Sequence, residues 1–589
     1  MYKLVTKTIL GALNRSKLIQ KVMNMEPVTS NPKRELSPVG SPPTAIKKPT
    51  PNPIQQKKKK EKKRKYKTKP IDKTSPLGIL QFEIQEILQQ HGLTSEQIIN
   101  DINTLLNTPS LTSTYHRDVS NVHVLQTSSN GDGLALVPHP IVPEHRQVVI
   151  IPFAIQGDIV SIRIFKTHPN YVEADLLSIT TASTNRDDSL IRCKYFGKCS
   201  GCQYQNLSYP QQLEFKRNTV HNAYKYLAPN LIAQGKVPQI GETVGSPLQY
   251  GYRTKLTPHF DVPRKGCLSY RPSLGFGRKG RPEWRDGDAG QSGDQSVLDI
   301  EECVIGTKII NLGMGNERAK FEEGWKSYKK GATVLLREHT RVGTREQSQA
   351  LEYCNEQDGS KDLNGNVSVD LVEDDDEGDK VLVKSCVTQS RQIVTEYING
   401  FTFEFSAGEF FQNNNSILPK VTEYVCSNLQ IPGKSKESPL YLVDAYCGSG
   451  LFSITASKGV DKVVGVDVSA DSIKFATRNA ARNGVLNTEF IDGKAEKIFE
   501  KIDTPSDLTS VIIDPSRKGC DEVFLNQLSD YKPARAVYVS CNVHSQARDI
   551  EWFLNNTTNG PEYKIESIRG FDFFPQTHHV ESVAVLSRV

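Results

Sequence analysis

The spacing of hydrophobic positions changes along the chain, and each change predicts a different kind of structure. Residues 76–106 carry apolar residues at helical intervals, with Ile79, Phe82 and Ile87 on one face. Residues 117–182 alternate with a period of two between turn residues. Several short strands in so small a region predict a β-barrel, whose turns and cations would suit an RNA-binding surface.

From residue 438 onward, short apolar runs alternate with helical patterns. Four such runs lead into Asp444, Asp467, Asp514 and Cys541. Strands that are apolar on both faces and alternate with helices are typical of a doubly wound parallel sheet, so an α/β fold is expected. Ligands of such sheets bind beyond the carboxyl ends of the strands, which is where these four residues are expected to lie.

The predicted domain organisation follows from these patterns. A chain of 589 residues is too long for one hydrophobic core. No apolar run reaches the roughly 18 residues that suggest a transmembrane helix, so no membrane association is expected. We expect a disordered basic extension over 1–75, a helical segment over 76–116 and a small β-barrel RNA-binding domain over 117–182. A central α+β RNA-binding domain follows over 183–405, and its acidic insert over 352–379 is expected to form a mobile loop. A doubly wound domain is expected over 406–589.

Charge is distributed unevenly within the net value of +6. Residues 57–69 contain ten Lys or Arg and one acid, which indicates a solvated tail, a nuclear-import signal or an RNA-binding arm. The first 25 residues contain five Lys or Arg and no acid, a pattern that fits a mitochondrial transit peptide or another basic tail. We therefore expect an intracellular protein of the nucleus or cytoplasm, with the mitochondrion as an alternative.

The turn at residues 444–450 indicates a nucleoside site. Gly448 and Gly450 allow the backbone to approach a ligand, and Asp467 ends the next strand, where a carboxylate can accept hydrogen bonds from a ribose diol. A dinucleotide fingerprint would need a third glycine, but Phe452 and Ser453 stand there. S-adenosylmethionine, a nucleoside without pyrophosphate, therefore fits better. A doubly wound domain without a nucleotide is the alternative.

A reactive group is predicted at the ends of the later strands. Cys541 follows a buried run, Asp514 and Arg517 follow another, and Glu581 lies near the C-terminus. A lone buried cysteine is usually inert packing. Methylation at carbon 5 of uracil, however, needs a thiolate that adds at carbon 6 and a base that removes the carbon-5 proton. Cys541 and Glu581 fit these roles, and Gln412, Asp514 and Arg517 can position the uracil.

These motifs resemble, in order, those of the RNA (uracil-5-)-methyltransferase family. The resemblance covers residues 119–589 and includes residues 410–413, 444–450, 514–519, 540–542, 547–549 and 574–581. Ser516 replaces a usual second proline, Val543-His544 replaces a usual Pro–Thr pair, and Asp467 stands where bacterial members often have Glu, which alters turn rigidity or reach but not the reactive groups. The resemblance implies S-adenosylmethionine contacts from Gln412, Tyr446, Asp467 and Asp514, with Cys541 as nucleophile and Glu581 as proton acceptor.

Four cysteines form a separate candidate site. Cys193, Cys199 and Cys202 lie within ten residues, and Cys303 follows at a distance. Iron–sulfur, zinc and unliganded thiols are all compatible with the spacing, which lacks the paired short knuckles of structural zinc. In the resembling family this arrangement holds a [4Fe-4S] cluster in some members, so such a cluster is expected here.

The expected substrate is RNA. Tyr252-Arg253-Thr254-Lys255, Arg264-Lys265, Arg271 and Arg278-Lys279 with Arg281 interleave aromatic and cationic residues, which suits contacts to phosphates and unpaired bases, although an exposed polar strand face would look similar. The resemblance implies either the T-loop uridine 54 of tRNA or uridines of ribosomal RNA. The basic extension favours the fungal-type members that act on tRNA. An RNA chaperone with a relict catalytic domain and a cytosine-5 methyltransferase are the disfavoured alternatives.

Overall fold

The computed structural model describes residues 63–67, 69–262, 270–281, 284, 296–344, 371–374, 380–435, 437–493, 498–499 and 502–589. The basic segment at 1–25, interpreted as a transit peptide or another basic tail, lies outside these residues. So do most of the basic run at 57–69, the pair Arg264-Lys265 and most of the acidic insert at 352–379. Within the insert, β13 (Leu371–Asp374) pairs antiparallel with β14 (Val381–Val387), so this part is a strand rather than the expected loop. β13 is the edge strand of its sheet and is paired on one side, with β14.

The N-terminal strands close into a barrel in the order β1-β2-β3-β5-β4. The strands are β1 (Asp118–Thr127), β2 (Gly133–Pro138), β3 (Arg146–Ile151), β4 (Ile159–Thr167) and β5 (Val172–Thr181). Along β4, Val160, Ile162 and Ile164 are fully buried in the barrel core, and the residues between them are more exposed. This alternation follows the period of two in the sequence and confirms the predicted barrel.

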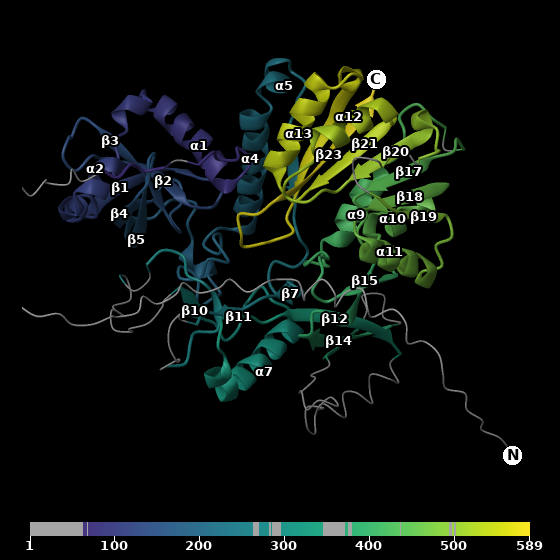
Figure 1. The fold of residues 1–589 in the computed structure, drawn as a ribbon, viewed down its shortest axis with the longest axis horizontal. Helices are drawn as coiled ribbons and strands as arrows, with labels where there is room; N and C mark the ends of the chain where they lie inside the picture. Colours follow the sequence, from purple (N-terminus) through teal and green to yellow (C-terminus); the bar gives the residue numbers. More distant parts are fainter. Residues whose placement is uncertain are drawn as a thin grey trace, which may run out of the picture. The chain divides into compact units, whose positions relative to one another are not determined.

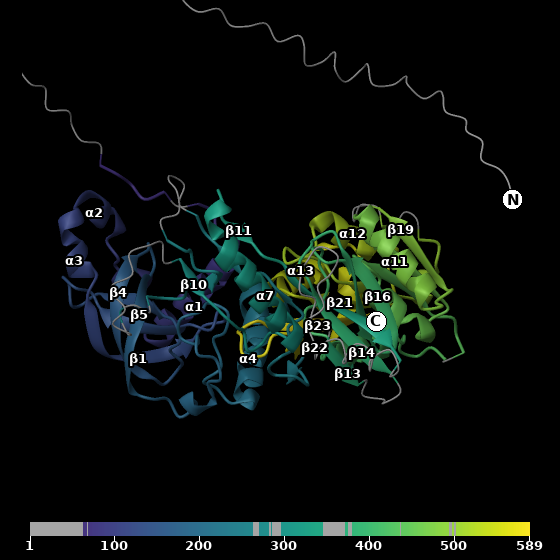
Figure 2. The ribbon, with the colours of Figure 1, turned by 90° about the horizontal axis from the view of Figure 1, so that it is seen from below.

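In the part of the chain that the structure describes, three α-helices precede the barrel. They are α1 (Pro76–Gln90), α2 (Ile102–Asn107) and α3 (Thr112–Tyr115). Figure 2 shows α2 and α3 beside the barrel strands. On α1, Ile84, Ile87 and Leu88 are buried in a cluster that also contains Leu134 and Val148 of the barrel. Ile79 and Phe82 of the same helix belong instead to a cluster with residues of α4.

The central region combines small antiparallel sheets with two long helices. One sheet has the order β10-β9-β8-β11, another has β13-β14-β12-β7, and β15 pairs with β16. The elements are α4 (Tyr209–Leu227), α5 (Pro229–Ala233), β7 (Lys255–Leu256), β8 (His259–Phe260), β9 (Gly275–Gly277), β10 (Val297–Asp299), α7 (Lys308–Gly324), β11 (Ala332–Thr333), β12 (Leu336–Gly343), β15 (Ile393–Ile398) and β16 (Phe401–Ser406).

The C-terminal domain is built on an eight-stranded sheet with the order β19-β18-β17-β20-β21-β23-β22-β6. The five strands from β19 to β21 are parallel, which confirms the doubly wound arrangement, and β23 runs antiparallel between β21 and β22. The strands are β6 (Gly241–Val244), β17 (Tyr441–Ala445), β18 (Lys462–Asp467), β19 (Thr488–Asp492), β20 (Thr509–Ile513), β21 (Arg535–Ser540), β22 (Tyr563–Phe571) and β23 (Glu581–Arg588).

Helices cover both faces of this sheet (Figure 1). Two large hydrophobic clusters lie on the two faces, one including Val443 and Val511 and the other Leu442 and Ile512. The helices are α9 (Leu418–Ser427), α10 (Leu451–Thr455), α11 (Ala470–Arg482), α12 (Glu522–Tyr531) and α13 (Val543–Asn556). Among the helices that the structure describes, none combines the length and the apolar character needed to cross a membrane.

Candidate active site

Cys541 lies in the turn between β21 and α13, at the carboxyl end of a parallel strand. Asn542 holds this turn: its side-chain oxygen accepts a hydrogen bond from His544 N (3.2 Å), and its Nδ2 donates to the carbonyl oxygen of Arg517 (3.0 Å). Ser540 Oγ accepts from Asn542 N at 3.1 Å. Cys541 is half-buried and stands just before the first turn of α13, where free backbone N–H groups favour negative charge.

Glu581 is the first residue of β23, the antiparallel neighbour of β21. Their pairing ends with Ser540 opposite Ser582, so the same register continued by one residue places Cys541 opposite Glu581. Residues opposite each other in an antiparallel pair project from the same face of the sheet. Glu581 is only 5% exposed. Cys541 and Glu581, the nucleophile and the proton acceptor that the sequence predicts, are therefore brought together at the ends of adjacent strands.

The electrostatics of this group identify Asp514 and Arg517 as its other members. Burial, followed by the charges of Glu581 and Asp514, raises the pKa of Cys541 to about 12. Burial and Asp514 raise the pKa of Glu581 to about 8, while the Arg517 cation opposes both shifts. The pKa of Asp514 rises to about 7 because of burial and the neighbouring Asp444. A thiol, two carboxyl groups and one cation thus influence one another at a single sheet edge.

The turn at residues 444–450 has the backbone conformation that its sequence predicts for a ligand site. Gly450 has a φ of +88° and Tyr446 a φ of +64°, so the chain turns sharply between β17 and α10. Asp467 lies at the end of β18, where its two carboxylate oxygens accept hydrogen bonds from Gly448 N (3.0 Å) and Ser469 N (2.8 Å). The carboxylate is held in place by these bonds and keeps further lone pairs for a ligand.

Two of the predicted cofactor residues are positioned less directly. Tyr446 is half-buried and packs on Phe524, with ring centroids 5.3 Å apart. Gln412 is buried, and its neighbour Asn414 donates from Nδ2 to the carbonyl oxygen of Phe573 (3.0 Å), which fixes the segment near the β22 end. A contact between Gln412 and a cofactor stays a prediction.

Asp444 is a residue to which the sequence motif gave no role. It is fully buried, accepts a hydrogen bond from Ser453 Oγ at 2.6 Å, and leaves its Oδ1 without a hydrogen-bond partner. Burial raises its pKa to about 7. A buried carboxyl oxygen without a partner, directly beneath the glycine turn, is a feature that a bound polar ligand or water would satisfy.

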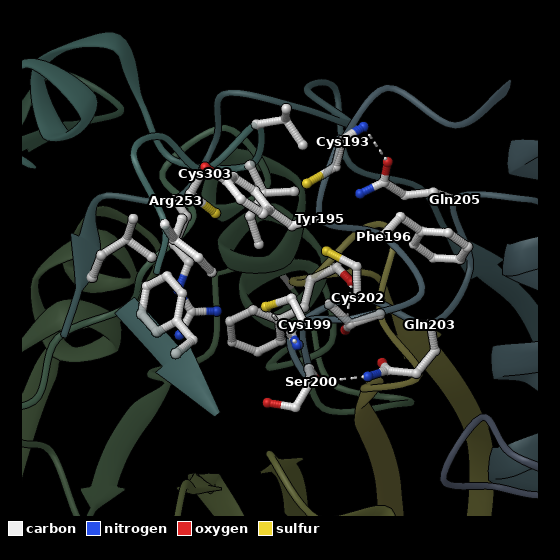
Figure 3. A pocket seen from close by; sticks show the side chains of 18 of the residues that line it. Cys193, Tyr195, Phe196, Cys199, Ser200, Cys202, Gln203, Gln205, Arg253 and Cys303 are labelled. Carbon is white, nitrogen blue, oxygen red and sulfur yellow. Dashed lines mark hydrogen bonds between the residues drawn. The ribbon is translucent and has the colours of Figure 1, made fainter. Parts of the chain in front are cut away.

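The four cysteines line one cavity of about 350 Å³ in the central region. Figure 3 shows Cys193, Cys199, Cys202 and Cys303 with their sulfur atoms directed toward its interior. None of the four forms a disulfide, and burial raises the pKa of each, that of Cys199 to about 11. Among the described residues, no group of three or more His, Cys, Asp or Glu side chains is arranged to hold a metal ion.

The same cavity extends to the loop that precedes Glu581. The sequence did not predict that the four cysteines and this loop lie side by side. Arg517, Phe574, His578 and His579 all contribute to its lining. Burial lowers the pKa of His579 to about 4, so this imidazole is neutral near pH 7. The sequence motif at residues 574–581 contained Phe574, His578 and His579, but within this motif only Glu581 had an assigned role.

Tyr252 corrects the expectation of an aromatic RNA-stacking residue. It is only 1% exposed, and its hydroxyl donates to the carbonyl oxygen of Pro575 at 3.0 Å. Because a buried phenol whose hydroxyl has a backbone partner cannot stack on a base, Tyr252 is a structural residue.

Arg271, one of the cations expected to contact RNA, forms salt bridges with Asp299 and Glu322.

Two family models and two fungal relatives match this chain. A family model described as tRNA (Uracil-5-)-methyltransferase matches residues 357–589, and a TRAM domain model matches residues 113–177. The chain is 57% identical over 532 residues to the tRNA (uracil(54)-C(5))-methyltransferase of Saccharomyces cerevisiae, which covers 89% of this chain and 83% of that protein. The enzyme of the same name from Schizosaccharomyces pombe is 42% identical over 505 residues, 85% of this chain and 84% of the relative.

A solved structure agrees with the fold. The crystal structure of Pyrococcus abyssi tRNA (uracil-54, C5)-methyltransferase in complex with S-adenosyl-L-homocysteine has a TM-score of 0.50 at 21% identity, over 79% of this chain and 100% of that chain. The doubly wound sheet and its strand-end site define a methyltransferase of the S-adenosylmethionine-dependent class. The chain belongs to the tRNA (uracil-5-)-methyltransferase family.

Proposed function

We propose that this chain methylates carbon 5 of the T-loop uridine 54 of tRNA with S-adenosylmethionine as methyl donor. The observation that carries the proposal is the strand register that sets Cys541 opposite Glu581, beside Asp514 and Arg517. The names of the two yeast relatives support tRNA as substrate, and the match to the TRAM domain model over the barrel supports an RNA-binding role there.

The residues divide the reaction between them. Cys541, as thiolate, adds to carbon 6 of the uracil and makes carbon 5 nucleophilic. After methylation, Glu581 removes the proton from carbon 5, the electron pair of that bond restores the C5–C6 double bond, and the C6–S bond breaks to release Cys541. Arg517 favours both ionised groups because its charge lowers their pKa values. S-adenosylmethionine, when bound, supplies the methyl group on a positively charged sulfur.

The donor would lie against the glycine turn at residues 444–450. Asp467, fixed by Gly448 and Ser469, would accept hydrogen bonds from the ribose, and Tyr446, Asp514 and Gln412 would line the remaining contacts. The buried, unpartnered oxygen of Asp444 supports a polar ligand in this turn.

Transfer of labelled methyl groups to a T-loop tRNA transcript and, separately, to ribosomal RNA fragments tests the proposal. Cys541→Ala should abolish both the product and the covalent RNA adduct, whereas Glu581→Gln should retain the adduct and lose the product. Methylation that survives Cys541→Ala would refute the mechanism. Methylation of ribosomal RNA alone would refute the choice of substrate.

We propose that Cys193, Cys199, Cys202 and Cys303 hold a [4Fe-4S] cluster. The direction of four thiols into one cavity supports this. Iron and acid-labile sulfide analysis with visible absorption of anaerobically purified protein tests it. Zinc without sulfide would show a zinc site instead, and neither metal would show free thiols.

We propose that the protein is intracellular and enters the nucleus through the basic run at residues 57–69. Fusion of residues 1–75 to a fluorescent protein should direct it to the nucleus. Mitochondrial accumulation would instead support a targeting role for residues 1–25.

A further inference from the structure

The loop at residues 572–580 joins β22 to β23 and leads directly into Glu581. Its centre is held by α4 through a reciprocal pair of hydrogen bonds. Gln212 Nε2 donates to Gln576 Oε1 at 3.1 Å, and Gln576 N donates to Gln212 Oε1 at 3.0 Å. Gln212 is 1% exposed. One buried amide of α4 therefore fixes both the backbone and the side chain of Gln576.

A second set of contacts comes from the segment that follows Cys202. The backbone N–H groups of Gln203 and Tyr204 both donate to the carbonyl oxygen of Gln576 at 3.0 Å. The side-chain oxygen of Gln203 accepts from His578 N at 3.2 Å and lies 3.0 Å from His578 Nδ1. The segment that follows Cys202 and the loop at residues 572–580 are thus joined by hydrogen bonds, although they are far apart in sequence.

A third contact is a buried ion pair at the start of the loop. Lys216 and Asp572 form a salt bridge in which both side chains have no exposed surface, and Lys216 Nζ also donates to the carbonyl oxygen of Phe574 at 3.0 Å. A charge without solvent must keep its partners, because an unpaired buried charge is strongly unfavourable. This pair therefore ties the loop to α4 at a second point.

The backbone of Gln576 shows what these contacts achieve. Its φ is +71°, a left-handed conformation that is uncommon for a residue with a side chain. Such a conformation persists where the surroundings determine it. Without its contacts the loop would relax, and Glu581, as the first residue of β23, would lie at a strand end free to fray.

We propose that Gln203, Gln212 and Lys216 are positioning residues that hold Glu581 in place for proton removal. The inference rests on the proposed function and adds residues to the same site. Glu581 acts only after the methyl group has been transferred: it takes the carbon-5 proton, and the C6–S bond breaks. A loosened loop should therefore slow release of the RNA more than formation of the adduct.

Gln212→Met and Gln203→Met in the full-length protein test this, since methionine keeps the length of the side chain and removes its hydrogen bonds. Each variant is incubated with T-loop tRNA transcript and labelled donor, and the denaturation-resistant protein–RNA adduct and the released product are measured over time. We expect adduct to accumulate while release slows by up to about 100-fold. Asn218→Ala, which removes an exposed amide from the same helix, is the matched control and should behave like the parent.

Glu581→Gln is measured in parallel as the reference for a failed release step. If it accumulates adduct while both methionine variants lose adduct and product together, the two glutamines have only a structural role and the inference is refuted. If Glu581→Gln forms no excess adduct, the role of Glu581 itself is refuted. Thermal unfolding of each variant identifies misfolding, and Gln203→Met then decides the question if Gln212→Met does not fold.

Discussion

If the Cys541–RNA adduct is first accumulated and the pH of the solution is then raised, the rate of adduct decay reports the proton removal assigned to Glu581. Its pKa of about 8 means that roughly a tenth of the carboxyl groups are ionised at pH 7 and roughly nine tenths at pH 9. Because only the ionised form can accept the proton, adduct decay should accelerate about tenfold between these values, with a midpoint near pH 8.

The assay forms the adduct at about pH 6.5, where release is slow, and then transfers it to buffers of higher pH. Decay is followed by denaturing gel electrophoresis of labelled RNA. Glu581→Gln is the control, and its slow decay should not follow this titration. A decay rate that is constant or falls with rising pH, or the same rise in Glu581→Gln, would refute the assignment.

Further predictions concern stability and cofactor binding. Lys216→Met should lower the free energy of unfolding by about 3–5 kcal/mol because it strands Asp572, and adding Asp572→Leu should recover part of this in chemical denaturation; no recovery would contradict the pairing. Gly450→Ala should weaken binding of the methyl donor and destabilise by about 1–2 kcal/mol because φ is +88°, as calorimetry can measure, and an unchanged affinity would exclude the turn from the donor site. Burial raises the pKa of Glu83 from 4.5 to about 7, so its contribution to stability is lost as the pH rises. The stability of the parent relative to Glu83→Gln should therefore fall by about 3 kcal/mol between about pH 4 and pH 8, and a constant difference would refute this.

The sequence predicted four of the five parallel strands, β17, β18, β20 and β21, because each is apolar on both faces. It did not predict β19, whose residues are only partly buried. It did not predict that β6, a short strand of the central region, pairs with β22 at the edge of the same sheet. Only four residues long, β6 has too little pattern to be recognised, and its pairing depends on contacts distant in sequence. Local periodicity identifies strands, but it does not identify their partners.

The candidate site was predictable where chemistry required a particular residue. Cys541 and Glu581 could be selected because the reaction needs a thiol and a base, and strand ends could be read from the apolar runs before them. Gln212, Gln203 and Tyr252 could not, because amides and phenols are common and their role depends on hydrogen bonds to a distant loop. Tyr252 was misassigned for the same reason: its burial is not visible in its basic surroundings.

The antiparallel pairing of β21 and β23 makes the separation of Cys541 and Glu581 insensitive to changes in chain length elsewhere. Insertions in α13 or in the turn before β22 would leave the ladder between Ser540 and Ser582 intact. An insertion inside β23 would instead turn Glu581 or its successors to the opposite face. The distance between Cys541 and Glu581 is thus set by backbone hydrogen bonds between β21 and β23. Almost any residue can form these bonds, so the surrounding sequence is free to diverge.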